Sequence, residues 1–300
     1  ETLLPLFQNA LSEVYTFLPE VKIGSKQSLS FNVTIYEKIL NALYPKLLAK
    51  QNINISGKIN STKKQSQIIV DFPFFNWEDF NFENIHFQLD TQNPIYNTYL
   101  SVDELVYKNE KVKDFNIIST TLKDTLYFRS EFIRSLNNSP FAINFYHTLD
   151  IDKNIVFGIQ NSELTFQESN WRLNPQNSKT QKILYNSENN RLEWNNFSLE
   201  SDSRISYVRT SGFWQGEERL SFSLDIKNLP WEAFIPQKDT FKTTGFIGLS
   251  MQYIQSPEEN KLLLDGEWKD SNVNGQALGN IMFNANGNTQ LNSYQIQMSL

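Results

Sequence analysis

The feature that most constrains this sequence is a strict alternation of apolar and polar residues, clearest between residues 154 and 231. A period of two places apolar side chains on one face of a β-sheet and polar side chains on the other. No catalytic motif interrupts the stretch, so we expect its function to follow from one long apolar face. The alternating apolar residues are Ile155, Phe157, Ile159, Leu164, Phe166, Trp171, Leu173, Leu192, Trp194, Phe197, Leu199, Leu220, Phe222, Leu224 and Ile226.

The same pattern continues on both sides of that stretch and defines many short strands. Residues 91–94, 136–140 and 174–177 separate some of the runs, and their Asn and Pro residues favour turns. Glycines gather in residues 245–279, where Gly inside a strand often marks a bend. Asn286-Gly287-Asn288 fits a hairpin turn. Short strands with turns between them are typical of an all-β meander.

These signals predict a mainly β protein. We expect a long curled antiparallel β-sheet, open as a groove or taco, with one or two short helices near the N-terminus. Residues 1–52 are predicted to form an N-terminal part with a strand and short helices, and residues 53–300 a continuous meander in one extended domain. A closed β-sandwich produces the same alternation and is the alternative fold.

A first helix is predicted in residues 3–18. Leu6, Ala10 and Val14 fall at helical spacing, and Pro5 is compatible with an early helical position. Pro19 ends the segment.

A second helix is predicted in residues 36–50. Ile39, Leu43 and Leu47 form an apolar stripe, and Pro45 is expected to kink or split the helix. We expect this helix to pack over an end of the sheet. A helix on a membrane surface is the sharper alternative, which the three lysines of the segment support only weakly.

Composition and charge exclude several classes of protein. The 27 basic and 33 acidic residues are interspersed, with a net charge of −6 and no basic stripe, so no nucleic-acid partner is expected. The absence of cysteine excludes disulfides and thiol chemistry. No apolar run approaches the roughly 20 residues that a helix needs to cross a bilayer, so this segment is expected to have no transmembrane span. Both ends read like the interior of a longer polypeptide, of which we expect this chain to be a segment.

The sequence contains no convincing catalytic or metal-binding motif. His86 and His147 lie in strand patterns without a His or carboxylate two residues away, so structural roles are expected. Residues 150–154 begin like a calcium loop, but Ile155 and Asn161 stand where that loop needs Gly and Glu. Neither a nucleophile elbow nor a Gly-rich phosphate loop is present. We therefore predict no enzyme, no metal and no cofactor.

A weak internal repeat links residues 114–119 with residues 196–201, each followed by another alternating run. Its spacing suits consecutive hairpins rather than a solenoid.

Four stretches give the chain a resemblance to the TamB-type family, in the AsmA-like group of bacterial envelope proteins. Each stretch is short and β-rich, but together they span most of the chain. The stretches are residues 17–21 with 28–31 and the Leu-rich segment around Pro45, residues 161–166 with 170–174, residues 194–199 with 204–205 and Gly212, and residues 224–229 with 245–248.

The resemblance implies a periplasmic segment of a protein that is anchored in the inner membrane of a Gram-negative cell. It implies an apolar β-groove that moves phospholipid between inner and outer membranes or supports outer-membrane protein assembly. The implied partners are phospholipid acyl chains and an outer-membrane barrel protein. The alternative from the residues alone is a closed β-sandwich whose Trp and Tyr residues bind glycan or protein. The candidate groove residues are Phe31, Phe87, Phe157, Phe166, Trp171, Trp194, Phe197, Phe222 and Leu224.

Overall fold

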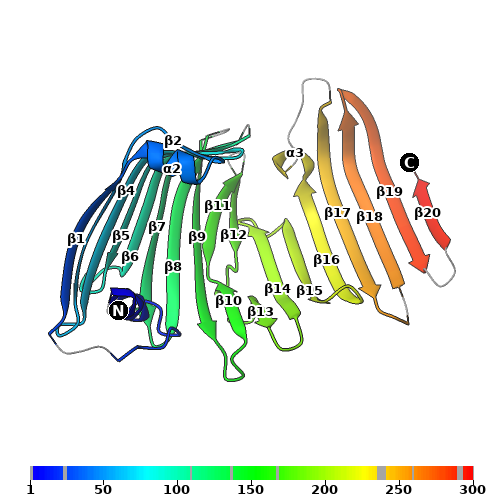
Figure 1. Cartoon of the computed structure of the whole chain (residues 1–300). Coiled ribbons are helices and arrows are strands. Elements are labelled where there is room, and N and C mark those ends of the chain that lie inside the picture. The colour runs from blue at the N-terminus through cyan, green and yellow to red at the C-terminus, as the bar shows by residue number, and fades with distance from the viewer. Residues whose placement is uncertain are drawn as a thin grey trace. The chain divides into compact units, whose positions relative to one another are not determined.

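The computed structural model describes residues 3–22, 26–108, 110–135, 138–166, 169–234, 241–258, 260–288 and 293–299. The chain divides into unit 1, Glu1–Thr148, and unit 2, Leu149–Leu300. Antiparallel strands dominate both units, which confirms the predicted mainly β fold (Figure 1). The predicted boundary at residue 52 does not coincide with this division, because β1 pairs with β3 across it, from Ser28 opposite Asn60 to Ile35 opposite Ile53.

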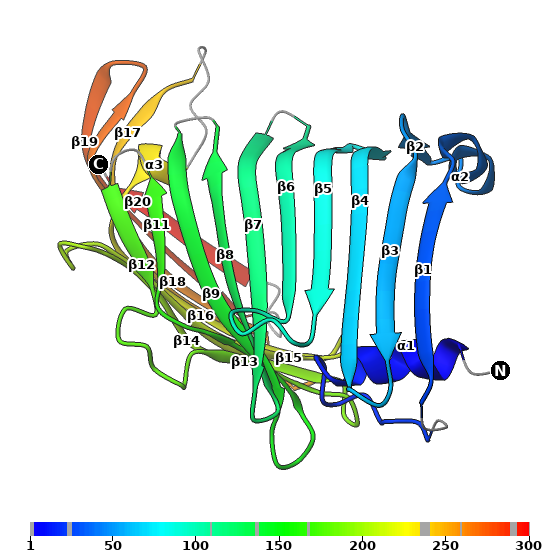
Figure 2. The same ribbon diagram turned by 90° about the vertical axis from the view of Figure 1, so that its left-hand side faces the viewer.

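Unit 1 contains one curled sheet in the order β1, β3, β4, β5, β6, β7, β8, β9 (Figure 2). The short strand β2 pairs with the far end of β4, beyond the part that pairs with β3. The elements are α1 (Leu3–Ser12), β1 (Ser28–Ile35), α2 (Glu37–Leu43), β2 (Leu47–Ala49), β3 (Ile53–Asn60), β4 (Gln65–Trp77), β5 (Phe80–Asp90), β6 (Thr98–Tyr107), β7 (Glu110–Leu122), β8 (Thr125–Arg134) and β9 (Ser139–Leu149).

Unit 2 is also a single antiparallel arrangement, in which β14 to β20 pair in sequence order. On its other edge, β14 pairs with β13 at one end and with β12 at the other end. Strand β10 pairs with β13, and strand β11 pairs with β12. The elements are β10 (Ile155–Ile159), β11 (Ser162–Phe166), β12 (Ser169–Leu173), β13 (Lys182–Asn186), β14 (Arg191–Ser201), β15 (Tyr207–Gln215), β16 (Arg219–Pro230), α3 (Trp231–Phe234), β17 (Thr243–Gln255), β18 (Asn260–Val273), β19 (Gln276–Asn288) and β20 (Ser293–Ser299).

Left-handed backbone recurs inside the strands at Asn and Asp residues, which tolerate it better than other side chains. The residues are Asn84 in β5, Asp114 in β7, Asn196 in β14, Asn228 in β16 and Asp270 in β18, with φ between 48° and 53°. The last four coincide with a shift of pairing register, which marks a β-bulge. Bulges bend a strand and increase its twist, so they curl each sheet. The internal repeat predicted from sequence begins at two of them, Asp114 and Asn196.

The bulges also reset the alternation. Trp194 pairs with Gly212 and Phe197 pairs with Thr210, so three residues on β14 span two on β15. Both aromatic side chains therefore lie on the same face, although strict alternation would put them on opposite faces. Ile226 and Leu229 are brought to one face in the same way.

Both N-terminal helices exist but are shorter than predicted. Helix α1 ends at Ser12, and turns follow it to residue 18. Helix α2 ends at Leu43, because Tyr44 precedes Pro45 and adopts a non-helical conformation with φ −130° and ψ 79°. Residues 47–49 then form β2 instead of continuing the helix.

The predicted turn at residues 286–288 is wrong. Asn286, Gly287 and Asn288 belong to β19, where they pair with β18 on one side and with β20 on the other. The connection between β19 and β20 lies outside the described residues, as do residues 136 and 137 of another predicted turn.

Candidate functional site

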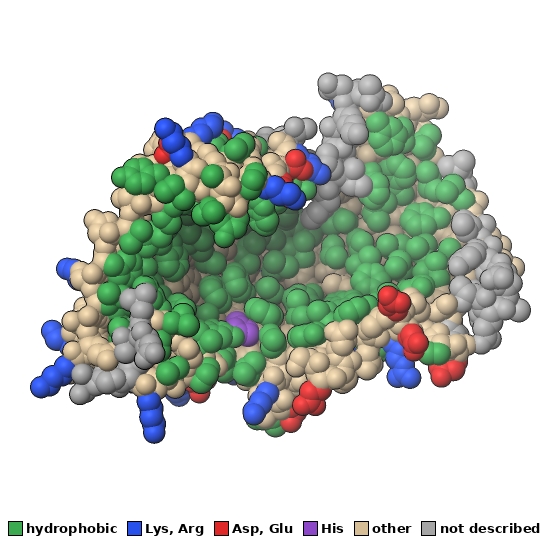
Figure 3. Space-filling view, viewed as in Figure 1, with side chains coloured by type: hydrophobic (Ala, Val, Ile, Leu, Met, Phe, Trp, Pro, Cys, Tyr) green, Lys and Arg blue, Asp and Glu red, His purple; other side chains and the backbone are tan. Residues whose placement is uncertain are grey.

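The unit-1 apolar face is the side of its sheet on which most residues are aliphatic or aromatic, with Gly57 and small polar residues such as Ser119 and Ser130 between them. Val70 of β4, for example, lies opposite Ile55 on one side and Phe87 on the other. The face comprises Leu29, Phe31, Val33, Ile55, Ile59, Ile68, Val70, Phe72, Ile85, Phe87, Leu89, Leu100, Val102, Phe115, Ile117, Phe128, Ile143 and Phe145. Figure 3 shows a hollow lined by hydrophobic side chains over these strands.

The unit-2 apolar face is built in the same way. Phe222 of β16 lies opposite Gly212 and Tyr253, and Leu224 lies opposite Thr210 and Met251. The face comprises Phe157, Leu164, Phe166, Trp171, Leu173, Ile183, Leu192, Trp194, Phe197, Leu199, Val208, Leu220, Phe222, Leu224, Ile226, Leu229, Ile247, Leu249, Met251, Tyr253, Leu262, Leu264, Ile281 and Phe283.

Most side chains of the two apolar faces are partly exposed rather than buried. In unit 1, only Ile59, Leu89 and Val102 of the face are buried, and Val33 is 45% exposed. A second sheet packed over the face would bury the whole row, as in a β-sandwich. Neither apolar face is therefore the interior of a closed sandwich in the part of the chain that the structure describes.

The accessible surface of the chain supports the same conclusion. It amounts to 18927 Å². Two compact monomers of half the mass each would together expose about 16,000 Å². The excess is expected of sheets that leave one apolar face uncovered.

Rings on both faces lie flat over glycines of the neighbouring strand. A Cβ atom built on Gly57 would come within 2.5 Å of the Phe31 ring, and one on Gly212 within 2.4 Å of the Trp194 ring. Each glycine is the direct cross-strand partner of its aromatic residue. The indole Nε1 of Trp194 also donates a hydrogen bond to Thr210 Oγ1 at 3.2 Å. These contacts hold the rings against the backbone and make a smooth apolar floor.

The structure places all nine candidate groove residues on these two faces. Phe31 and Phe87 belong to unit 1, and the other seven share the face of unit 2. Their accessibility differs strongly, since Phe157 is 44% exposed whereas Trp171 is only 1% exposed. Of these two candidates, Phe157 therefore offers far more surface to a ligand than Trp171.

A continuous aromatic run on unit 1 was not among the sequence candidates. Ring centroids lie 5.0 Å apart for Phe72 and Phe75, 5.1 Å for Phe75 and Phe82, and 4.4 Å for Phe80 and Tyr107. Phe72 and Phe75 are three residues apart, so alternation assigns them to opposite faces. The intervening Pro73, which cannot donate a ladder hydrogen bond, was the signal for an irregular strand.

One end of the unit-1 apolar face is covered by α1 and the turns after it. Leu6, Ala10 and Ile59 form a buried cluster. The Tyr15 hydroxyl hydrogen-bonds His147 Nε2 at 2.8 Å, and their rings stack with centroids 5.5 Å apart. His147 therefore has the structural role predicted for it, through a partner 132 residues away.

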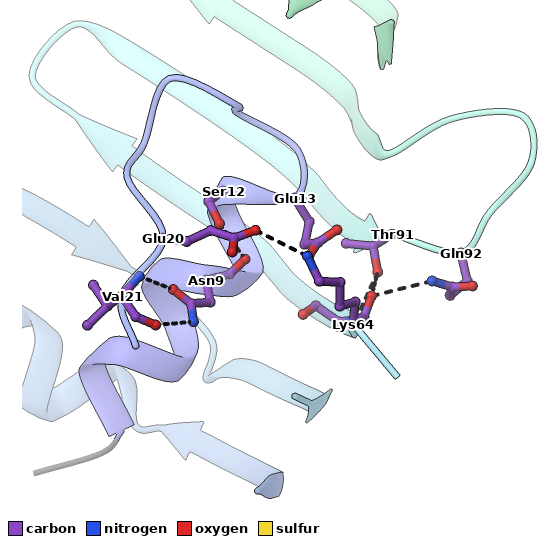
Figure 4. Close-up of polar contacts among 9 residues, drawn as sticks. Asn9, Ser12, Glu13, Glu20, Val21, Lys64, Thr91 and Gln92 are labelled. Carbon is purple, nitrogen blue, oxygen red and sulfur yellow. Dashed lines mark hydrogen bonds and ion pairs between the residues drawn. The ribbon is translucent and has the colours of Figure 1, made fainter. Parts of the chain in front are cut away.

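Polar contacts fasten this cover to the strand turns beneath it (Figure 4). Lys64 Nζ lies 3.2 Å from Glu20 Oε1 and 3.5 Å from Glu13 Oε1. The hydrogen bond to Glu20, together with the charge of Glu13, raises the pKa of Lys64 above its usual value. The Lys64 carbonyl oxygen accepts hydrogen bonds from Thr91 and Gln92, which ties the β3–β4 turn to the β5–β6 turn.

Other titratable side chains of the described residues pair with neighbours or respond to burial. His86 pairs with Asp71 across β5 and β4 at 2.7 Å, and both side chains are exposed. Burial raises the pKa of Tyr146, and the Asn154 side chain lowers the pKa of Asp150 by donating a hydrogen bond to its carboxylate. Among the described residues, no three His, Asp or Glu side chains are grouped to hold a metal ion.

Comparisons with protein-family models, curated proteins and solved structures find no match to this chain. Within the described ranges, none of the helices has the length and apolar character needed to cross a bilayer.

Proposed function

We propose that this chain is a segment of an envelope protein that carries phospholipid along its two apolar faces, in the periplasm between an inner and an outer membrane. The observation that carries the proposal is the partial exposure of both apolar faces, which span nearly every strand of each unit. The resemblance of the sequence to the TamB-type family supports the location and the anchoring of the full-length protein in the inner membrane.

The chemistry of the faces fits acyl chains. Transfer of each methylene from water to an apolar surface is worth about 0.8 kcal/mol when it is fully buried. A surface of Phe, Leu, Ile and Trp side chains covers one side of an acyl chain, and no single contact binds the chain strongly. The backbone N–H and C=O groups beneath the apolar side chains are hydrogen-bonded within the sheet, so no unpaired backbone group lies against the acyl chain.

Support for the two other roles is weaker. In a glycan- or protein-binding β-sandwich the apolar side chains would be buried between two sheets, whereas most of them are partly exposed in both units. Assistance to outer-membrane protein assembly rests on the family resemblance alone. Phospholipid is therefore the ligand that we propose.

The proposal is tested by lipid binding to the full chain, with matched substitutions on opposite faces of one strand. In unit 2, Leu224→Glu places a charge on the apolar face, and Ser223→Glu places one on the other face of β16. In unit 1, Phe87→Glu and Gln88→Glu form the equivalent pair on β5. The ligand is a fluorescent phospholipid supplied below its micelle-forming concentration, with native mass spectrometry of bound lipid as the second readout.

We expect Leu224→Glu and Phe87→Glu each to lower lipid binding several-fold, because a carboxylate beside an acyl chain must lose its hydration. The controls should bind like the parent chain, and circular dichroism should show that all variants are folded. Equal binding by both members of each pair, or a folded parent chain that binds no phospholipid, would refute the proposal.

A further inference from the structure

A further apolar surface lies at the end of the unit-1 sheet that carries α2 and β2 (Figures 1 and 2). It consists of six large side chains from α2 and its flanking residues, from β2 and from the end of β4. We call this set the apolar tip. Its members and their exposed fractions are Tyr36 57%, Ile39 53%, Leu43 69%, Tyr44 61%, Leu48 53% and Trp77 51%.

The elements of the tip are held together by specific contacts. The Asn41 side chain pairs with the Ala49 backbone, accepting from its N–H at 2.8 Å and donating to its C=O at 3.1 Å. Strand β2 pairs in turn with the end of β4, where Leu47 lies opposite Trp77. Lys46 Nζ reaches Glu78 Oε1, in the turn after β4, at 3.3 Å. The tip is therefore an ordered part of unit 1.

Helix α2 buries none of its residues. An isolated helix of this length is unstable in water, and helices in proteins are normally stabilised by burying an apolar stripe. Here the stripe containing Ile39 and Leu43 points into solvent. The apolar stripe of α2 therefore has no packing partner in the described part of the chain.

We propose that the apolar tip docks on the surface of a phospholipid bilayer, inserting α2 and the adjoining aromatic side chains into the interface. This inference takes the proposed lipid carriage as its premise, and it names the place where the carrier meets a membrane.

The residue types favour a bilayer over a protein partner. Tyr and Trp combine an apolar ring with a polar group and concentrate at membrane interfaces, where Leu and Ile enter the acyl region. Lysine side chains extend past the apolar layer to reach phosphate groups. Residues 36–50 hold three lysines and one glutamate, and all three lysines are exposed, with Lys46 paired to Glu78 beside Trp77.

The size of the tip argues against a second copy of this chain. The six side chains expose on the order of 600 Å² together, whereas a stable protein interface buries about 800 Å² on each partner. Insertion of a few side chains suffices for reversible membrane contact, because each adds its own transfer free energy.

The tip is also continuous with the unit-1 apolar face. Trp77 lies opposite Phe80, whose ring stacks on Tyr107. Phe80 lies 6.2 Å from Phe82, ring centroid to centroid, and the run continues to Phe75 and Phe72 on the face. Aromatic surface therefore connects the docking side chains to the site that would accept a lipid.

The test is flotation of the full chain with vesicles of phosphatidylethanolamine and phosphatidylglycerol. The variant Leu43→Ser with Tyr44→Ser removes apolar surface from the tip, and Ile95→Ser, at a site 70% exposed in the β5–β6 loop, is the matched control. Vesicles with brominated acyl chains should quench part of the tryptophan fluorescence, and Trp77→Phe should remove that part. Binding of the soluble fluorescent phospholipid is measured on every variant.

We expect the double variant to lose at least tenfold in vesicle binding and to keep its binding of soluble lipid, with Ile95→Ser unchanged in both. Docking is overturned if the double variant floats like the parent chain, or if the parent chain binds soluble lipid but no vesicles. It is also overturned if light scattering shows that the tip joins two copies of the chain. If the parent chain binds no soluble lipid, the proposed function is refuted instead.

Discussion

Helices α1 and α2 lie at opposite ends of the unit-1 strands and differ in what they bury (Figure 2). Helix α1 presses Leu6 and Ala10 against Ile59 of the sheet, leaving them 5% and 2% exposed. Helix α2 has no buried residue. Both are short and carry an apolar stripe, so the sequence makes them look alike.

The two helices nevertheless share one fastening device. Asn9 of α1 pairs with both backbone groups of Val21, each at 2.8 Å. Asn41 of α2 pairs with both backbone groups of Ala49. One amide side chain thus fixes each helix to the chain. The two helices differ in packing, because α1 covers the apolar face and α2 lies exposed in the apolar tip. A hydrogen-bonded attachment and burial are therefore separable: α1 is part of the core, whereas α2 is attached but exposed.

The largest expected effect is on stability when apolar side chains of the two helices are truncated. We predict that Leu6→Ala destabilises unit 1 by about 2–3 kcal/mol, because it empties a buried site. Leu43→Ala should change stability by less than about 0.5 kcal/mol, because Leu43 is already in solvent. Urea unfolding of the full chain, followed by circular dichroism, measures both. Equal losses of unfolding free energy in the two variants would contradict the difference in burial between α1 and α2.

A smaller effect is expected from the paired asparagines. Asn9→Ala and Asn41→Ala each remove two hydrogen bonds to backbone groups, at a cost of about 1–2 kcal/mol. In α1 the loss should appear in global unfolding, since the cover is part of the buried cluster. In α2 it should appear only as faster local hydrogen exchange in residues 37–49. Unchanged exchange there would show that α2 is held by something other than Asn41.

The smallest effect is expected from the lysines near each helix. Lys64 pairs with Glu13 and Glu20 beside α1, and Lys46 pairs with Glu78 beside α2, but both lysines are exposed. Lys64→Met and Lys46→Met should each alter stability only slightly, and less still at high salt.

The pH dependence of the Lys64 contribution has a definite sign. Its pKa is raised in the folded state above the ordinary 10.5. Its stabilising effect is therefore complete below that pH and is lost as the pH rises through the folded value. Comparing urea unfolding of the parent chain and Lys64→Met at neutral and strongly alkaline pH checks the sign. A difference that grows with pH would contradict the contacts drawn in Figure 4.

Much of the fold could be predicted from the sequence because the alternation is so regular. Most strands and the two N-terminal helices appear where the patterns indicated, although both helices are shorter than predicted. The failures share a physical cause. At Asn286-Gly287, turn-forming residues remain in a strand because partners are available on both sides. At residues 47–49, pairing with β4 replaces helical spacing.

The candidate face was predictable only in part. Alternation identified Phe87 and Phe222, but whether such residues face solvent or a second sheet depends on tertiary layering that one strand does not encode. Phe75 was missed because Pro73 interrupts the alternation before it. The exposure of α2 was equally hidden, since a helical stripe has the same spacing whether it meets a sheet or water.

The partial exposure of the two faces has a thermodynamic consequence. Heat-capacity change on unfolding arises mainly from apolar surface newly brought into water, typically about 12–15 cal/mol/K per residue. In this protein much of that surface is already hydrated in the native state. Calorimetry should give a smaller value per residue and a flatter curve of stability against temperature. Any ligand that covers the faces would restore the missing heat capacity, so occupancy could be followed by calorimetry without a label.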